Sequence, residues 1–166
     1  MILGMSIGAF TLLHLVITLV AIGSGLIVVG GMFASNKLPG TTALFLFTTA
    51  LTSVTGFLFP IRAFTPALGV GIVACVILAS ALFALYKERL VGVWRPIYVI
   101  TAIVSLYLNV FVLVAQSFMK ISGLNALAPT QSEPPFTITQ GVVFVIFALI
   151  ALIAVVRFRP VTVIRA

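Results

Sequence analysis

Neutral hydrogen-bonding side chains recur along one face of an apolar stretch late in the chain. Ser105 and Asn109 are four residues apart, and Gln116 follows two turns later on nearly the same helical face. An earlier apolar stretch carries Thr48 and Thr52 at the same spacing. Such groups at membrane depth either hydrogen-bond to a neighbouring helix or line a path for a solute. We favour helix packing over a solute path, because every group is neutral and a neighbouring helix can satisfy it.

Residues for acid–base, metal or haem chemistry are scarce. The two acids, Glu88 and Glu133, fall in separate polar breaks, and His14 is the one histidine. The apolar stretches therefore lack the carboxylates that paired-carboxylate catalysis, a Ser-His-Asp triad or a proton pump requires. Bis-histidine haem ligation within the chain is excluded, and we expect His14 to hydrogen-bond to a neighbouring hydroxyl. The sequence predicts no enzyme, no cofactor and no metal.

Small residues form a second stripe. Helices in lipid use such stripes for close contact, because the hydrophobic effect does not drive helices together there. The only cysteine belongs to the stripe, so a disulfide or a thiolate metal site within one chain is excluded. The predicted contact stripe recurs every four residues and consists of Ala67, Gly71, Cys75 and Ala79.

Apolar stretches long enough to cross a bilayer must position these residues. The chain is 63% hydrophobic and 7% charged, too few polar residues to cover a water-soluble fold. A spanning helix needs about 20 mostly apolar residues. Five stretches qualify, at about 7–33, 41–59, 67–86, 97–119 and 136–156. We predict an all-α polytopic transmembrane helical bundle, with residues 1–166 forming a single domain of five spanning helices.

The longest break between these stretches ends in a proline-rich loop. It contains Gln131 and Glu133 shortly before two prolines, which restrict the backbone to extended conformations. A stiff connector and a site that docks a partner are equally compatible with this loop. Thr137 and Gln140 match the Thr-x-x-Gln pattern of a capping box, which predicts the start of the last helix.

The nine cations and the net charge of +7 are scattered between apolar runs, which is typical of membrane flanks and predicts no nucleic-acid partner. With five crossings, one side of the membrane would hold seven cations. The other side would hold only Arg62 and Lys120. Because Lys and Arg are retained in the cytoplasm, we expect the N-terminus outside and the C-terminus inside. The seven are Lys37, Lys87, Arg89, Arg95, Arg157, Arg159 and Arg165.

Three segments together carry a resemblance. They are LPGTTALFLFTTALTSVTGFLFP at 38–60, SLYLNVFVLVAQSF at 105–118 and LAPTQSEPPF at 127–136. The chain resembles uncharacterised small multi-pass inner-membrane proteins of bacteria, a group with no assigned activity. The resemblance implies a bacterial inner (plasma) membrane and transfers no functional residue.

The pattern as a whole favours a nonenzymatic accessory or self-associating subunit of a membrane assembly. Its expected partners are the lipid bilayer and either other membrane-protein subunits or further copies of the chain. The alternative is a passive channel or carrier for a small neutral or anionic solute, lined by Thr52, Ser105, Asn109 and Gln116.

Overall fold

The computed structural model describes residues 1–60 and 66–160, and five of its helices are long and apolar enough to cross a membrane. The predicted all-α bundle with five spanning helices is confirmed. A short helix, α5 (Ser122–Leu127), precedes the last of them. The spanning helices are α1 (Ile7–Phe33), α2 (Pro39–Phe57), α3 (Pro66–Leu82) with its π-helical continuation η1 (Phe83–Lys87), α4 (Trp94–Lys120) and α6 (Pro134–Arg157).

Prolines begin most of these helices. Pro39 and Pro134 occupy the first helical position of α2 and α6, and Pro96 is the third residue of α4. The first turn of a helix needs no amide donor, so proline is tolerated there. These helices consequently begin two or three residues earlier than the apolar pattern alone predicts.

The predicted capping box at Thr137 and Gln140 is wrong. α6 begins at Pro134 with Glu133 as its N-cap, so Thr137 lies inside the helix and its hydroxyl donates to the carbonyl of Glu133 at 3.3 Å. Gln140 is buried one turn further along and donates from Nε2 to the carbonyl of Phe111 in α4 at 3.0 Å. Its side chain therefore joins two helices instead of capping one.

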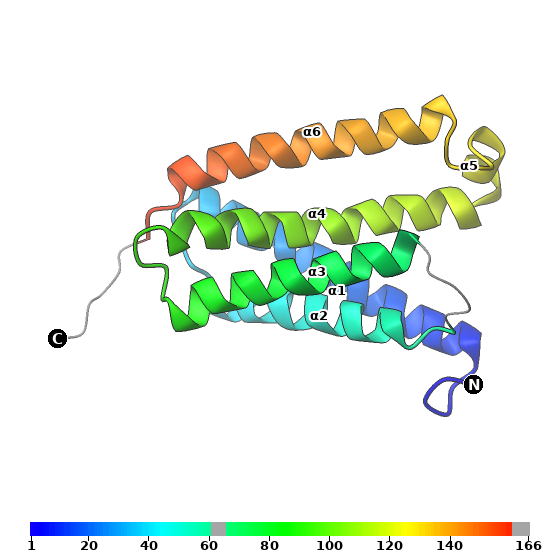
Figure 1. The fold of residues 1–166 in the computed structure, drawn as a ribbon, viewed down its shortest axis with the longest axis horizontal. Coiled ribbons are helices and arrows are strands. Elements are labelled where there is room, and N and C mark those ends of the chain that lie inside the picture. The colour runs from blue at the N-terminus through cyan, green and yellow to red at the C-terminus, as the bar shows by residue number, and fades with distance from the viewer. Residues whose placement is uncertain (61–65, 161–166) are drawn as a thin grey trace.

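The helices form a bundle with its two ends well separated (Figure 1). α6 packs along α4 at one edge, and the N-terminus and the end of α6 lie at opposite ends of the bundle. Arg95 links the start of α4 to the end of α6, because its Nη1 donates to the carbonyl of Val155 at 3.1 Å and to that of Phe158. Interaction with the last carbonyls of a helix is favourable for a cation.

Charge is distributed unequally between the two ends. Lys120 lies at the end that holds the N-terminus, whereas the other described cations lie at the opposite end, near the connections α1–α2 and α3–α4 and the end of α6. Arg62 and Arg165 lie outside the described residues. The cations at the opposite end are Lys37, Lys87, Arg89, Arg95, Arg157 and Arg159.

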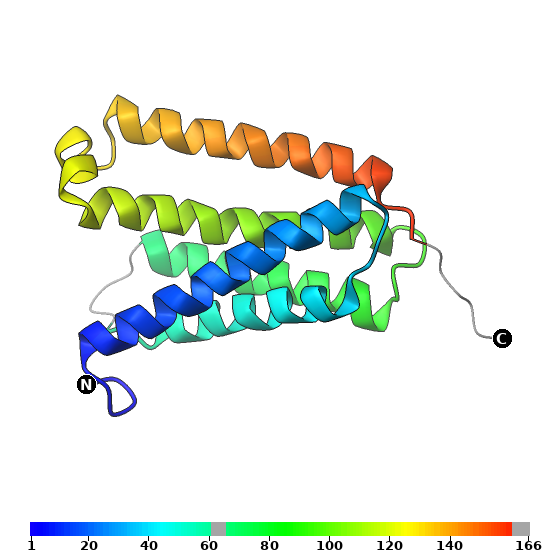
Figure 2. The same cartoon turned by 180° about the vertical axis from the view of Figure 1, so that it is seen from behind.

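α1 crosses the bundle diagonally and meets α4 at a glycine (Figure 2). A Cβ added at Gly25 would lie 2.6 Å from Cδ1 of Leu106 and 2.9 Å from Cε2 of Phe45. Only glycine permits so close an approach. From this crossing toward the C-terminus of α1 the bundle is tightly filled, and we call this region the packed half. Its largest buried side chains include Met32, Phe45, Tyr98, Ile103, Leu106 and Phe158.

Candidate functional site

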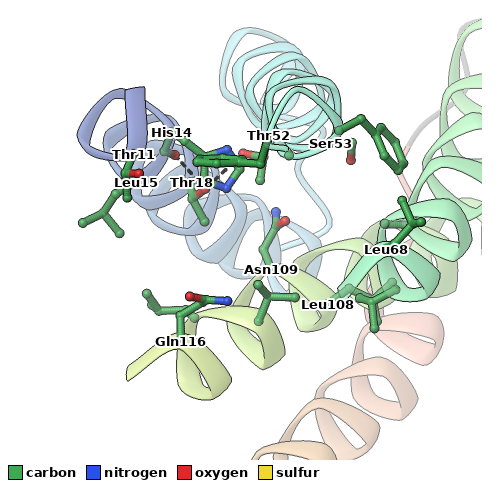
Figure 3. Close-up of a pocket in the computed structure, with 18 of the residues that line it drawn as sticks. Thr11, His14, Leu15, Thr18, Thr52, Ser53, Leu68, Leu108, Asn109 and Gln116 are labelled. Atoms are coloured by element: carbon green, nitrogen blue, oxygen red, sulfur yellow. Dashed lines mark hydrogen bonds between the residues drawn. The ribbon is translucent and has the colours of Figure 1, made fainter. Parts of the chain in front are cut away.

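A cavity of about 600 Å³ occupies the other half of the bundle. Its walls come from the N-terminal halves of α1 and α3 and from the C-terminal halves of α2 and α4. Figure 3 shows side chains from these four helices facing a common space. The volume falls within the roughly 300–1,000 Å³ that is usual for small-molecule sites.

The two sides of the cavity differ in chemistry. The wall from α3 carries no polar side chain among its described residues, which are Leu68, Val70, Gly71 and Ala74. The walls from α1, α2 and α4 carry hydroxyls, amides, an imidazole and one ammonium group. No carboxylate is among the described lining residues. The polar lining residues are Thr11, His14, Thr18, Thr52, Ser53, Asn109, Gln116, Ser117 and Lys120.

The end of the cavity next to the packed half, which we call its floor, is lined by two hydroxyl groups that already donate their protons to backbone carbonyls. Thr18 donates to the carbonyl of His14 at 2.8 Å, and Thr52 donates to the carbonyl of Thr48 at 3.0 Å. Their oxygens lie 3.4 Å apart. A hydroxyl has one proton and two lone pairs. Each therefore retains acceptor capacity at the floor of the cavity.

His14 has a defined partner. Its Nδ1 lies 2.7 Å from Oγ1 of Thr55, and that hydroxyl in turn donates to the carbonyl of Leu51 at 2.7 Å. With the hydroxyl proton used in that bond, the neutral tautomer that carries its proton on Nδ1 would donate to Thr55 and leave Nε2 as an acceptor. Phe59 packs edge-on against the ring, with centroids 5.4 Å apart. The predicted hydroxyl partner of His14 is confirmed.

The structure separates Asn109 from Gln116. Asn109 is 8% exposed and donates from Nδ2 to Oγ1 of Thr49 in α2 at 3.2 Å, so it does contact the threonine-rich face. Gln116 also lines the cavity, but its amide makes no hydrogen bond within the described part of the chain. Its donors and its acceptor are therefore available to a ligand.

Two of the predicted polar residues lie below the floor. Thr48 is buried and donates to the carbonyl of Leu44 at 2.7 Å. Ser105 is 1% exposed, and its Oγ has no hydrogen-bond partner among the described residues. Of the predicted polar face, Thr52, Asn109 and Gln116 line the cavity, whereas Thr48 and Ser105 belong to the packed half.

The wall from α1 was not singled out by the sequence. Thr11, His14 and Thr18 are three and four residues apart and share one face, which was the available signal. The run is otherwise strongly apolar, and no role was predicted from the sequence for the two hydroxyls. From the sequence, Lys120 was treated only as a membrane flank, although it is an exposed lining residue in the last turn of α4; we call this end of the cavity its mouth.

The small-residue stripe of α3 does not form one surface. Gly71 lines the cavity, and a Cβ added there would lie 3.2 Å from the ring of Phe57 in α2. Cys75 is a half-buried free thiol and Ala79 is exposed. The side chain of Ala67 lies outside the described residues.

The loop before α6 is held within the chain. Gln131 donates from Nε2 to the carbonyl of Ala115 in α4 at 2.7 Å. Glu133 accepts from the amide of Thr130 at 3.1 Å, from the hydroxyl of Thr130 at 2.9 Å and from the amide of Ser132 at 3.1 Å. Desolvation raises the pKa of Glu133, but hydrogen bonds from its own backbone, Thr130 and Ser132 outweigh this and hold the pKa below its usual value.

Comparison with known proteins adds no relative. No protein-family model, curated protein or solved structure matches the chain. The chemistry of the cavity is therefore the basis for a functional proposal.

Proposed function

We propose that this chain is a nonenzymatic multi-pass membrane protein that binds a small neutral or anionic solute in the cavity. The observation that carries the proposal is the set of hydrogen-bonding groups left free at membrane depth, above all the amide of Gln116. Polar groups inside a membrane are costly and commonly mark binding sites or pathways. Packing alone accounts for Asn109, which has a partner on α2, but does not account for Gln116.

The charge of the lining defines the class of solute. The described lining residues include Lys120 and no carboxylate, so a bound cation would find no opposite charge. Hydroxyl, amide and imidazole groups offer both donors and acceptors to a neutral or anionic solute. A binding site for such a solute is the best match to this set.

The packed half closes the cavity on one side. Below Thr52 and Asn109 the bundle is filled by Phe45 and Leu106, each 1% exposed. This arrangement favours a site that is closed at one end over an open pore. The sequence suggests either a passive channel or a carrier, and the closed end of the cavity supports the carrier.

The accessory-subunit role, which the sequence favours, is the second proposal. Its predicted contact stripe is weakened as an intermolecular surface because Gly71 packs against Phe57 of the same chain. Only Cys75 and Ala79 of the described stripe residues remain for contact with another chain. Co-purification of a second polypeptide in mild detergent would favour this role.

The proposed location is a bacterial inner membrane with the N-terminus outside and the C-terminus cytoplasmic. Support comes from the resemblance described above and from the uneven charge of the two ends, since cations are retained in the cytoplasm. In this orientation the mouth of the cavity, marked by Lys120, faces the outside. Cysteine labelling of each end in intact cells tests the orientation.

A pair of variants on α3 tests the binding proposal. Ala74→Phe fills the apolar wall of the cavity, whereas Ala79→Phe adds the same side chain on an exposed position of the same helix. Purified proteins are heated with a panel of neutral and anionic solutes. A solute that binds at 100 times its Kd stabilises the folded state by about 2.7 kcal/mol. We expect stabilisation of the wild type and Ala79→Phe but not of Ala74→Phe. Equal stabilisation of all three would place binding outside the cavity.

A further inference from the structure

We propose that the solute is an elongated anion with hydrogen-bonding groups along one edge, an apolar opposite edge, and its negative charge at one end. This inference rests on the proposed function and names the chemical class that the cavity accepts. It follows from the length of the cavity, from the distribution of polar groups between its walls, and from the position of its one described cation.

The lining of the cavity is extended. On α4 its lining extends from Asn109 to Lys120, a rise of about 16 Å at 1.5 Å per residue. An elongated solute can therefore contact polar groups at both ends of this lining.

Polar groups line the cavity along its whole length. Asn109 lies at the floor, Gln116 is about 10 Å higher on α4, and Lys120 is at the mouth. On α1, Thr18 lies at the floor and His14 one turn above it. A ligand with one polar head and a plain hydrocarbon tail would leave the amide of Gln116 and the remaining acceptor capacity of Thr18 and His14 unused, which is unfavourable for partly buried polar groups. A ligand with polar groups spaced along one edge would pair them.

The facing wall suits an apolar edge. Its described residues on α3 are Leu68, Val70, Gly71 and Ala74. Gly71 has no side chain, and the apolar ring of Phe57, which also lines the cavity, lies 3.2 Å from the position that a Cβ there would take. A flat apolar surface of the ligand can therefore lie against this wall.

The negative end belongs at the mouth. Lys120 is exposed in the last turn of α4 and forms no ion pair within the described residues. Glu133, the acid of the neighbouring loop, is held by Thr130 and Ser132. At the mouth an anion can approach Lys120 while remaining partly hydrated, so it avoids the large cost of burying a charge.

Cholate is a suitable probe because its rigid steroid carries hydroxyls on one face, methyl groups on the other and a carboxylate at one end. Binding of radiolabelled cholate below its micellar concentration is measured with the full chain in lipid nanodiscs. Laurate, with the same charge but a plain tail, is the comparison. We expect saturable cholate binding, and at least tenfold weaker binding of laurate.

Substitutions distinguish the contribution of the ligand's polar edge to binding from that of its charge. Gln116→Leu should weaken cholate binding about fivefold, the value of one hydrogen bond, without loss of any internal bond. Lys120→Gln should weaken cholate binding roughly two- to fivefold, and this effect should be smaller at high salt. Lys120→Arg should retain the binding of the wild type. Gln140→Leu, a buried polar position between α4 and α6 and outside the cavity, should leave binding unchanged.

The outcomes distinguish this inference from the proposed function. Cholate and laurate could bind equally, in a way that Ala74→Phe abolishes and Gln116→Leu does not affect. That result would overturn the ligand with one polar and one apolar edge, while the cavity would remain a binding site. Absence of saturable cholate binding to the wild type would also overturn it, and the solute panel would still test the cavity. Cholate binding that persists in Ala74→Phe would overturn both.

Discussion

Gly25 is the residue whose replacement tests the architecture most directly. It lies where α1 crosses α4, and the crossing separates the packed half from the cavity. A Cβ at this position would lie 2.6 Å from Cδ1 of Leu106 and 2.9 Å from the ring of Phe45. Gly25→Ala should therefore destabilise the bundle, although alanine is the better helix former.

The magnitude follows from these distances. Carbon atoms pack best at about 3.5–4.0 Å, so the Leu106 methyl would have to retreat by about 1 Å. Leu106 and Phe45 are each 1% exposed, so any displacement must be accommodated within the core. Overpacking of this kind costs about 1–3 kcal/mol, and the gain in helix propensity returns about 0.5–1 kcal/mol. We expect a net loss of roughly 0.5–2 kcal/mol in the free energy of unfolding.

The matched control is Gly23→Ala in the same helix. A Cβ at Gly23 meets nothing within 4 Å, so this variant should be unchanged or stabilised by up to about 1 kcal/mol. Unfolding in mixed micelles with increasing SDS can be followed by the fluorescence of Trp94, the only tryptophan. The two variants should differ by about 1–3 kcal/mol.

A second substitution identifies the clash. Leu106→Ala removes the methyl group nearest to the added Cβ, so Gly25→Ala should cost little more in that background, and the two substitutions should be non-additive. Equal stability of Gly25→Ala and Gly23→Ala in the wild-type background would refute the close crossing. The division of the bundle into a packed half and a cavity would then lose its physical basis.

Three further predictions concern other contacts. Arg95→Ala removes charged hydrogen bonds to the end of α6, so it should cost about 1.5–3 kcal/mol in SDS unfolding, and Arg95→Leu should not restore it. The pKa of Glu133 is lowered in the folded loop, so its contribution to stability is complete above the usual value of 4.5 and is lost as the pH falls through the lowered value; a carboxyl NMR titration with a midpoint at or above 4.5 would contradict this. Asn109→Leu loses its bond to Thr49, at about 0.6 kcal/mol, and should remain folded by circular dichroism while solute binding weakens; unchanged binding would leave Asn109 with a packing role alone.

The spanning helices could be predicted because the signal for them is local. Length and apolar composition suffice, and the first predicted stretch agrees with α1 at both ends. The errors of two or three residues occur at the starts of α2, α4 and α6 and at the end of α2, which is Phe57 and not residue 59. Pro39, Pro96 and Pro134 belong to first turns, where a missing amide has no cost. The capping box predicted at Thr137 is wrong because α6 already begins at Pro134, which places Thr137 inside the helix.

The cavity could be predicted only in part. Thr52, Asn109 and Gln116 were found because polar side chains at helical spacing are conspicuous in an apolar stretch. Ser105 shares the face of Asn109, yet it lies in the packed half with an unpaired hydroxyl. Spacing assigns a residue to a face, but it does not say whether the neighbouring helices fill the space opposite that residue.

The sequence by itself determined that this chain crosses a membrane five times, because the free energy of placing a helix in lipid depends on its own composition. Tertiary structure alone decided where the helices leave space. The approach of α1 to α4 at Gly25 closes one half, and His14 and Thr18 come to face Asn109 across the other. Such placement depends on contacts between residues far apart in the chain, and no local pattern encodes it.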